Sequence, residues 1–396
     1  MRKITNDDNP GAPWGTLTGI RPAKVAAKLL LSGKAAEAVI DILKQEYFVS
    51  PDKAEICVET AQAALKFKES LVPRDVALYV GIPFCPTRCA YCSFVSNSVE
   101  RSFNLIDPFI ETLLRETETM AKLVDELGLR IISVYIGGGT PTALPDSAIE
   151  SVMSTLEQSF DLSNLREYTV EAGRPDTITK QKLELMTKLG ARRICINPQS
   201  MSNEVLAAIG RVHSARDVYR AVKLVRQTGV ALNMDIIAGL PCDTPDGFRN
   251  TLDTVLTFKP ENITVHTLSL KKGSRIMLEG TDIPSGADVG KMLIYASGRL
   301  RESGYAPYYL YRQKYISGGF ENTGWSRTGY EGVYNICMME ELCTVLALGG
   351  GGVTKLVTKD GRIERIFNAK YPREYIIMVQ KINDKIGRIR ENAVSI

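Results

Sequence analysis

The hydrophobic pattern of the N-terminal part of the chain is helical. Between residues 21 and 70, apolar side chains recur at three- and four-residue spacing, as in Val25 and Leu29, which places them on one face of a helix. Pro51 stands where the last helix of this stretch would begin, and its fixed φ angle suits a first turn. The pattern therefore predicts a helical segment over residues 1–74.

From Val76 onward the pattern changes to short apolar runs that alternate with helical stretches. The six runs are VALYVGIP, RIISVYIGGGTP, EYTVEAG, RRICINPQS, VALNMDIIAGLP and NITVHTLSL. Gly190 and Gly229 end two of the helical stretches, where C-caps favour glycine. Strict strand–helix alternation predicts a parallel sheet, and six units are two fewer than a closed barrel has. We therefore expect an α/β fold with an open, partial (β/α)6 TIM-like barrel over residues 75–270.

Beyond residue 270 the alternation stops. The stretch GYAPYYLYRQKYISGGFENTGWSRTGYEGVYN is rich in aromatic residues, glycine and arginine, which favours an irregular or β-containing lid. NICMMEELCTVLALGGGGVTK is interpreted as a short helix followed by a glycine run, and PREYIIMVQKINDKIGRI as a helix. Residues 271–396 are therefore predicted to form a smaller C-terminal domain that serves as a substrate or lid domain.

The predicted strands share a second property, because they end in residues that are unusual in a core. Three cysteines follow the first strand and GGGTP ends the second, while the next three carry Glu171, Gln199 and Asp235 at or near their ends. In parallel α/β folds, ligands bind beyond the carboxyl ends of the strands. These groups are therefore expected to converge on one site.

Composition argues against several other classes of protein. The chain has 396 residues, 44% of them hydrophobic, which is enough to bury a sizeable core. A net charge of +4 lacks the basic excess of a dedicated nucleic-acid binder, so no nucleic-acid partner is expected. No apolar run is long enough to span a membrane, and none at the N-terminus resembles a signal peptide. We expect a cytoplasmic protein.

Eight cysteines and only two histidines, His213 and His266, limit the options for metal binding. Disulfide frameworks are rare in cytoplasmic proteins, so the cysteines are expected to be reduced. Five are scattered and are interpreted as small buried hydrophobes: Cys57, Cys195, Cys242, Cys337 and Cys343. The other three lie within eight residues of one another: Cys85, Cys89 and Cys92.

Four interpretations of the clustered cysteines compete. A zinc site takes four tetrahedral ligands, and the chain offers no second cysteine pair at ligand spacing. A reactive thiol needs one cysteine rather than three. Three buried structural cysteines would leave Pro83, Pro86 and Arg88 unexplained. An iron–sulfur cluster suits thiolates, and with three protein ligands it keeps one iron open for chemistry.

The spacing Cys85-x3-Cys89-x2-Cys92 resembles the cluster motif of the radical S-adenosylmethionine (SAM) superfamily. The surrounding LYVGIPFCPTRCAYCSF is similar to the family of oxygen-independent coproporphyrinogen III oxidases, as are YIGGGTPT, INPQS, IGRVHS and MDIIAGLP. WGTLTGIRPAK and PYYLYRQK resemble its HemZ-type branch, the coproporphyrinogen dehydrogenases. The resemblance runs from about Trp14 to Lys355.

This resemblance implies that the three cysteines hold a [4Fe-4S] cluster and that SAM binds the iron they leave open. It also implies SAM contacts at ten positions: Tyr79, Tyr91, Gly138, Gly139, Thr140, Glu171, Gln199, Arg211, Asp235 and Ser269. The residue types suit the ligand. Arg211 can pair with the SAM carboxylate, and Glu171 or Asp235 can accept hydrogen bonds from ribose hydroxyls.

The resemblance further implies an oxidoreductase of porphyrin and haem biosynthesis. The family's reaction removes a hydrogen atom from a propionate β-carbon of coproporphyrinogen III, then carbon dioxide and an electron, and leaves a vinyl group. Two such reactions give protoporphyrinogen IX. The implied partners are a small tetrapyrrole substrate and an electron donor such as a flavodoxin or ferredoxin.

A flat substrate with four carboxylates calls for aromatic and basic side chains. The C-terminal region offers them at Tyr308, Tyr309, Tyr311, Arg312 and Lys314, and the N-terminal segment offers the weaker candidates Arg21 and Lys24. An equally good interpretation is that these tyrosines pack in the core and that the charges lie on the surface.

The chain departs from the family pattern at two places. Gly81 stands where the bacterial oxidases of the family usually have a histidine, and EAGRP follows the third strand where an acidic, proline-containing turn is usual. Related proteins of the superfamily include haem chaperones and haem-degrading methyltransferases. An alternative function is therefore that of a haem-binding carrier or haem-modifying relative, with His213 and His266 as candidate axial ligands.

Overall fold

All six predicted strands are present in the structure of the chain, a computed structural model. It describes residues 12–19, 21–92, 97–270, 274–358, 362–377 and 379–392. The start of the predicted N-terminal segment, residues 1–11, and the first residues of the predicted C-terminal domain, residues 271–273, lie outside this description.

The residues group into two compact units that interleave along the chain. The first unit consists of residues 1–69, 199–209 and 235–331, and the second of residues 70–198, 210–234 and 332–396. The division into residues 1–74, 75–270 and 271–396 stays a prediction.

The second unit holds most of the parallel sheet. Its strands are β1 (Asp75–Ile82), β4 (Arg130–Gly138), β5 (Glu167–Gly173), β6 (Arg193–Gln199), β11 (Thr344–Gly349), β12 (Val353–Val357) and β13 (Ile363–Phe367), with a separate short pair, β2 (Phe84–Cys85) and β3 (Asn97–Ser98). The order of the larger sheet is β13-β12-β11-β1-β4-β5-β6-β7, and β7 (Ala231–Ala238) is shared between the units. The predicted α/β class with a large parallel sheet and N-terminal helices is confirmed.

Strand β11 was not predicted. The apolar run at Thr344 was interpreted as the end of a helix and a glycine run, but it pairs in parallel with β1, with Leu346 opposite Leu78. Antiparallel β12 and β13 extend the sheet from there. The parallel part of the sheet therefore continues on the far side of the first predicted strand.

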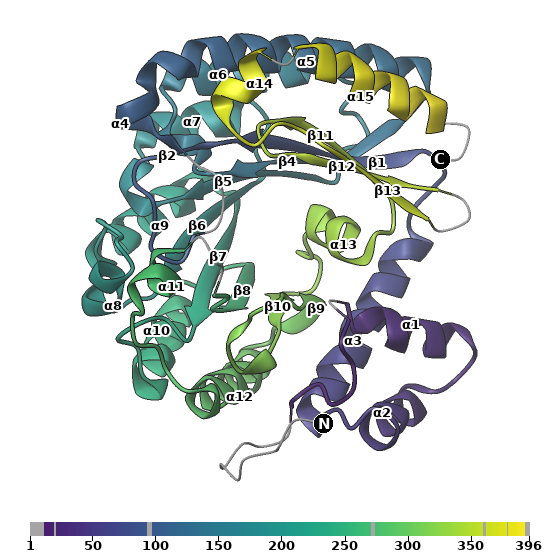
Figure 1. The fold of residues 1–396 in the computed structure, drawn as a ribbon, viewed down its shortest axis with the longest axis vertical. Coiled ribbons are helices and arrows are strands. Elements are labelled where there is room, and N and C mark those ends of the chain that lie inside the picture. The colour runs from purple at the N-terminus through teal and green to yellow at the C-terminus, as the bar shows by residue number, and fades with distance from the viewer. Residues whose placement is uncertain are drawn as a thin grey trace. The chain divides into compact units, whose positions relative to one another are not determined.

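Helices cover both faces of this sheet, as Figure 1 shows for the second unit. They are α4 (Val99–Ser102), α5 (Ile106–Glu126), α6 (Asp146–Ser159), α7 (Lys180–Lys188), α9 (Ala215–Thr228), α13 (Val333–Glu340), α14 (Pro372–Ile377) and α15 (Val379–Asn392), with short 3-10 turns at Phe103–Leu105, Pro141–Ala143 and Pro175–Thr177. Helix α5 packs on one face, and α13 lies on the other, beside β1 and β4. Strand β1 is buried at every position except Tyr79, as expected when both faces are covered.

The parallel register brings the carboxyl ends of the strands together. Gly81 of β1 lies opposite Gly137 of β4 and Gly349 of β11, and Ile82 lies opposite Gly138. Segments that follow these strands therefore begin at one edge of the sheet, as the sequence pattern predicted for this unit.

The first unit contains the N-terminal helices and three further strands. Its helices are α1 (Ala23–Leu31), α2 (Ala36–Gln45), α3 (Pro51–Glu69), α8 (Asn203–Ala208), α10 (Pro245–Thr257), α11 (Arg275–Glu279) and α12 (Gly286–Glu302), and its strands are β8 (Asn262–Thr267), β9 (Ala306–Tyr311) and β10 (Asn322–Ser326), with a 3-10 turn at Ser317–Gly319. Strand β10 is antiparallel to both β8 and β9. The tyrosine-rich stretch was therefore correctly expected to contain β structure.

Each unit ties a terminal segment to its core through a buried glutamate. In the first unit, the Oε2 atom of Glu321 accepts from Trp14 Nε1 at 2.9 Å and its Oε1 atom lies 2.7 Å from Lys53 Nζ. In the second unit, Glu116 accepts from Lys385 and from the Tyr375 hydroxyl. A buried carboxylate requires such donors, because an unpaired one would carry a large desolvation cost.

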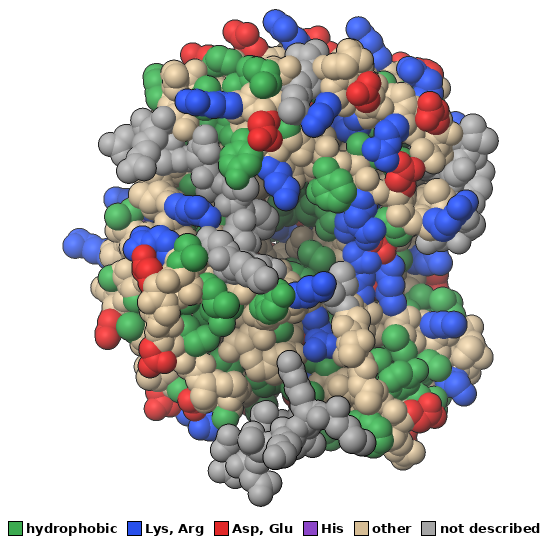
Figure 2. Space-filling view, viewed as in Figure 1, with side chains coloured by type: hydrophobic (Ala, Val, Ile, Leu, Met, Phe, Trp, Pro, Cys, Tyr) green, Lys and Arg blue, Asp and Glu red, His purple; other side chains and the backbone are tan. Residues whose placement is uncertain are grey.

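The outer surface around α5 and α15 carries both acidic and basic side chains. Glu126 of α5 and Arg390 of α15 form a bidentate pair with both N–O distances at 2.8 Å. Figure 2 shows acidic and basic side chains interspersed over this part of the visible face. Among the helices that the structure describes, none is long and apolar enough to cross a membrane.

Candidate functional site

The three clustered cysteines lie in the loop that follows β1. Cys85 is the last residue of β2, and Cys89 and Cys92 sit in a turn closed by a 3.1 Å bond from the Cys92 amide to the Cys89 carbonyl. All three are partly exposed, whereas Cys57, Cys195, Cys337 and Cys343 are buried. The interpretation of the scattered cysteines as buried hydrophobes is confirmed for those four and wrong for Cys242, which is exposed.

The glycine motif after β4 approaches this cysteine loop. A Cβ atom on Gly139 would lie 2.4 Å from the Phe84 carbonyl oxygen and 3.0 Å from Cys85 Sγ, so only glycine fits. The next residue, Thr140, donates its amide to the Phe84 carbonyl at 2.7 Å and its hydroxyl to Cys85 Sγ at 3.5 Å. The predicted site residues Gly139 and Thr140 therefore contact a cysteine of the motif directly, next to Gly138 at the end of β4.

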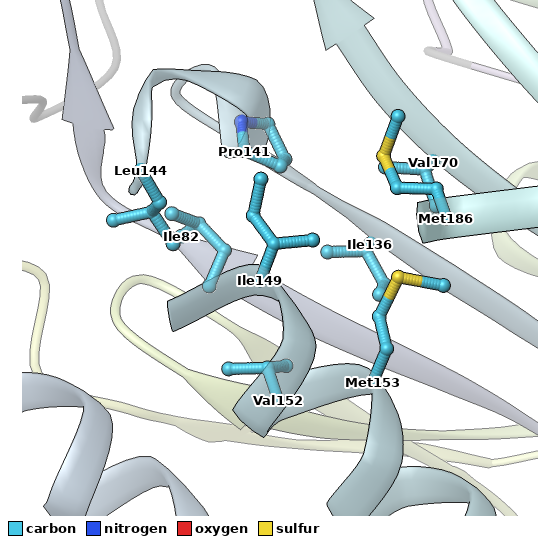
Figure 3. Close-up of a pocket in the computed structure, with 9 residues that line it drawn as sticks. All are labelled: Ile82, Ile136, Pro141, Leu144, Ile149, Val152, Met153, Val170 and Met186. Atoms are coloured by element: carbon cyan, nitrogen blue, oxygen red, sulfur yellow. The ribbon is translucent and has the colours of Figure 1, made fainter. Parts of the chain in front are cut away.

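A pocket lined only by apolar residues lies behind these strand ends, and none of its lining residues is a candidate catalytic or binding residue. Figure 3 shows strand residues such as Ile82 and Ile136 facing Ile149 and Met153 of α6 across it. Pro141, which follows Thr140, closes one side. The pocket is part of the core that supports the glycine loop.

Arginine residues dominate one flank of the cysteine loop. Arg174, in the departing EAGRP turn, is 3% exposed and donates Nε to Asp176 Oδ1 at 3.0 Å. Its Nη1 atom donates to the Thr87 hydroxyl at 3.0 Å and lies 4.0 Å from Cys89 Sγ. Sequence reasoning noted this departure but assigned Arg174 no role.

Arg211 lies on the same flank. Its guanidinium donates to the Tyr91 hydroxyl at 3.1 Å and to the Asn197 carbonyl at 2.6 Å. Burial alone would lower the pKa of Arg211, but Tyr91 and Cys89 raise it, and the net shift is upward. At 8% exposure Arg211 is not a solvated surface charge, so the functional interpretation of this arginine gains support.

His213 is buried beside these charges without ordinary partners. Its closest acidic atom is Asp176 Oδ1, at 3.8 Å from Nδ1, and both ring nitrogens lack a hydrogen bond within the described part of the chain. Burial, then Arg211, lowers its pKa to about 4, so the ring is neutral near pH 7. The Ser214 amide donates to Asp217 at the start of α9, which fixes the end of this loop.

Aromatic rings stack beside Glu171, on the two strands that lead to the cysteine loop and to the glycine motif. Tyr79 of β1, Tyr135 of β4 and Tyr334 of α13 stack with near-parallel planes, and the closest ring centroids, those of Tyr135 and Tyr334, are 4.3 Å apart. The Tyr135 hydroxyl donates to Glu171 Oε1 at 2.5 Å. Burial, then the Glu171 carboxylate, raises the pKa of Tyr79.

Two members of this stack were missed by sequence reasoning. Tyr135 is the register partner of Tyr79 on the neighbouring strand, so pairing the two predicted strands in parallel could have found it. Tyr334 lies on α13, 199 residues beyond Tyr135 in the chain, and no local pattern predicts that contact.

The glycine that replaces a family histidine is required by packing. A Cβ atom on Gly81 would lie 2.5 Å from the carbonyl oxygen of Gly350, which follows the unpredicted strand β11. The Gly350 amide in turn donates to the Gly81 carbonyl at 3.0 Å. A side chain at position 81 is therefore incompatible with the close approach of β11.

The remaining predicted site residues belong to the first unit. Gln199 is buried with a left-handed φ of 67°, and its Oε1 atom has no hydrogen-bond partner among the described residues. Asp235 lies 3.6 Å from Nε2 of His266, and the Ser269 hydroxyl donates to the Lys314 carbonyl at 3.1 Å. The roles of these residues stay predictions.

The candidate substrate residues of the first unit divide into two groups. Tyr308 and Tyr309 are buried, which supports the packing interpretation. Arg312 donates to the carbonyls of Leu17 and Gly319, so its charge already holds the N-terminal segment. Besides Arg312, the candidates that keep exposed surface are Tyr311, Lys314, Arg21 and Lys24.

Comparison with known proteins places these features in a family. A family model described as "Radical SAM superfamily" matches residues 79–255. The oxygen-independent coproporphyrinogen-III oxidase-like protein HemZ of Bacillus subtilis (strain 168) is 39% identical over 369 residues, which cover 91% of this chain and 74% of HemZ. The chain belongs to the HemZ-type family of radical SAM proteins.

Other proteins match less closely. The heme chaperone HemW of Buchnera aphidicola subsp. Schizaphis graminum is 30% identical over 59% of this chain and 61% of HemW. The structure of coproporphyrinogen III oxidase (HemN) from Escherichia coli, a radical SAM enzyme, superposes with a TM-score of 0.62 at 21% identity over 82% of this chain and 72% of that chain. The HemN comparison confirms the fold of this HemZ-type chain.

The residues present fit the cluster that radical SAM proteins hold. The cysteine sulfurs have donors nearby, Thr140 at Cys85 and Arg174 at Cys89, as hydrogen-bonded thiolates require. No three His, Cys, Asp or Glu side chains among the described residues are gathered as for a single metal ion. That finding does not weigh against a cubane cluster, in which each thiolate binds a different iron.

Buried polar atoms without partners fit SAM. Arg211 Nε and Gln199 Oε1 both lack hydrogen bonds within the described ranges, and each is predicted to contact SAM. Buried polar groups are normally paired, so unpaired ones at predicted contacts are suited to a polar ligand. The individual assignments of residues to cluster and SAM stay predictions.

Proposed function

We propose that this HemZ-type radical SAM protein is an enzyme that decarboxylates propionate side chains of coproporphyrinogen III without oxygen, in porphyrin and haem biosynthesis. The observation that carries the proposal is 39% identity to an oxygen-independent coproporphyrinogen-III oxidase-like protein across 91% of the chain. The arrangement around the three cysteines supports it, because the charged and the aromatic residues each supply groups suited to one part of the cofactor set.

Cys85, Cys89 and Cys92 would hold the [4Fe-4S] cluster, with SAM beside them. When bound, these groups supply one electron that splits SAM into methionine and a 5′-deoxyadenosyl radical able to abstract a hydrogen atom. The chain's own residues bind and orient. Arg211 offers a buried cation for the SAM carboxylate, and the Glu171 carboxylate, held by Tyr135, accepts hydrogen bonds.

The balance of the proposed reaction is simple. A hydrogen atom would leave the β-carbon of a propionate and join the 5′-deoxyadenosyl radical, which thereby becomes 5′-deoxyadenosine. Carbon dioxide then leaves, one electron passes to a one-electron acceptor, and the two carbons that remain become a vinyl group. The protein's part is to orient the substrate and to exclude water and oxygen. Of the candidate substrate residues, Lys314 and Lys24 are exposed and Tyr311 is partly exposed.

The decisive experiment is anaerobic turnover of the full chain with a reconstituted cluster, SAM, dithionite and coproporphyrinogen III. The expected products are vinyl-bearing porphyrinogens and 5′-deoxyadenosine, identified by mass spectrometry. Cys89→Ala lacks one of the proposed cluster ligands and serves as the inactive control, from which neither product is expected. Formation of 5′-deoxyadenosine without any vinyl product would show that the chain is a radical SAM enzyme with another substrate.

A second candidate function is that of a haem-binding carrier, favoured by the match to HemW. The two candidate axial ligands differ in how far their side chains are exposed. The His213 side chain is fully buried, whereas that of His266 is 27% exposed. If the chain carries haem, His266→Ala should weaken stoichiometric haem binding measured by the Soret band. A chain that binds no haem excludes this function.

The partners and location complete the proposal. An electron donor such as a flavodoxin or ferredoxin would deliver the electron, and the cytoplasm would provide the compartment. Reduction of the reconstituted protein by purified flavodoxin, followed by visible spectroscopy, tests the first of these.

A further inference from the structure

The EAGRP turn places a buried guanidinium against the cysteine loop. Arg174 makes two hydrogen bonds to Asp176, from Nε at 3.0 Å and from Nη2 at 3.1 Å. Its remaining terminal nitrogen faces Thr87 at 3.0 Å and Cys89 Sγ at 4.0 Å. One planar fork therefore joins the turn after β5 to the residues between the first two cysteines.

Arg174 makes contacts besides its ion pair with Asp176. An arginine with 3% exposure is costly to bury, and the Asp176 pair uses only one edge of the fork. The other edge is directed at a hydroxyl and a sulfur of one loop. The contacts of that edge are explained if Cys89 carries negative charge, because a thiolate accepts N–H bonds and attracts the cation.

The charges around Cys89 do not cancel. Arg174 and Arg211 approach from two loops, and Asp176 is the acidic partner of Arg174. His213 lies 3.8 Å from Asp176 and is neutral near pH 7, since burial and then Arg211 lower its pKa to about 4, so it adds no positive charge. Arg174, Arg211 and Asp176 therefore place two cations and one carboxylate on this side of the cysteine loop.

We propose that Arg174 makes the cluster held at Cys89 easier to reduce. Reduction by a one-electron donor adds one electron, and hence one unit of negative charge, next to a buried cation that also donates toward a cluster thiolate. Both effects favour the reduced state, since charge and hydrogen bonds at the sulfurs set cluster potentials. The proposal rests on the cluster binding of the proposed function and adds the residue that tunes it.

The test is a redox titration of the reconstituted protein with dithionite, followed by electron paramagnetic resonance. Arg174→Gln removes the charge, and we expect the ratio of reduced to oxidised cluster at a fixed potential to fall about tenfold, a shift of about 59 mV for a one-electron couple. Arg174→Lys keeps the charge and should lie closer to wild type. Arg192→Gln, at an exposed arginine, is the matched control and should not shift.

Asp176→Asn provides an independent test if Arg174→Gln fails to fold. It removes the countercharge and should shift the potential in the opposite direction, toward easier reduction. Opposite shifts in the two variants support the proposal. Unchanged potentials, or shifts in the same direction, in variants with full iron content overturn it.

The outcome is distinguishable from failure of the proposed function. Absence of a cluster in the wild-type protein contradicts both. A wild-type cluster with an unmoved potential in Arg174→Gln contradicts this inference alone, whatever the turnover assay shows.

Discussion

The charged residues beside the cysteine loop and the aromatic residues of β1, β4 and α13 are arranged in different ways. The charged flank (Arg174, Asp176, Arg211 and His213) comes from the turn after β5 and from the loop between α8 and α9, and its contacts are hydrogen bonds and ion pairs. The aromatic flank (Tyr79, Tyr135, Tyr334 and Glu171) comes mainly from the strands and from α13, and its rings stack. The first controls charge beside the cysteines, whereas the second controls the position of one carboxylate.

This difference predicts different effects of substitutions in the two flanks. Loss of a charged group changes the electrostatic potential around Cys89 while the backbone stays in place. Loss of an aromatic contact changes geometry, because stacked rings and close glycines leave little space for adjustment. Variants of each flank should therefore differ in what they alter, either the properties of a bound cluster or the fit of the fold and of SAM.

The largest effect is expected from the cysteine that the charged flank faces. Cys89→Ala removes one of the three proposed cluster ligands and should abolish retention of iron and sulfide after anaerobic reconstitution. The measurement is iron and sulfide content together with visible absorption. Cys242→Ser changes an exposed cysteine and is the matched control, with full iron content expected. Equal iron content in both variants would contradict the cluster assignment.

The next largest effect is expected at Gly81, beside the aromatic flank. Gly81→His restores the residue usual in the bacterial oxidases, but its Cβ would collide with the Gly350 carbonyl oxygen at 2.5 Å. We expect destabilisation of roughly 3 kcal/mol from overpacking, measured by urea unfolding of the apoprotein. Gly298→Ala, in helix α12 with open space around it, is the control and should be neutral or stabilising. Unchanged stability of Gly81→His would show that β11 adapts easily.

A smaller effect is expected at Tyr135. Tyr135→Phe keeps the stacked ring but removes the 2.5 Å bond to Glu171. Hydrogen bonds to charged groups are worth about 1.5–3 kcal/mol, so SAM should bind about tenfold more weakly while cluster content stays at the wild-type level. Isothermal titration with SAM measures the first and iron analysis the second. Tyr371→Phe, at an exposed tyrosine, should leave both unchanged; loss of iron in Tyr135→Phe would contradict the separation of the flanks.

The sequence predicted fewer residues of the charged flank than of the cysteine loop that this flank contacts. The strands were predictable because their apolar runs and turns are local signals, and the motif that contains Arg211 singled this residue out as a predicted SAM contact. Arg174 was visible only as a departure, since its partners Thr87 and Cys89 lie 87 and 85 residues away. For the aromatic flank, β11 and Tyr334 depend on pairing between the two ends of the chain, which periodicity does not reveal.

The smallest expected effect is a pH dependence from His213. Its pKa is lowered to about 4 in the folded protein by burial and by Arg211, against about 6.5 when unfolded. Between these values the unfolded chain binds more protons, so this residue lowers the stability as the pH falls from 6.5 toward 4. The loss at pH 5.5 should be about 1 kcal/mol relative to pH 7.5.

His213→Gln isolates this contribution, because the other titrating groups are shared with wild type. Urea unfolding of both apoproteins at several pH values gives the difference in stability between them. That difference should change between pH 7 and pH 5 in the direction that favours the variant at low pH, since glutamine takes up no proton. A difference that does not vary with pH would mean that the pKa of His213 is the same in the folded and the unfolded protein. His213 would then add a third cation to the charged flank only below about pH 6.5.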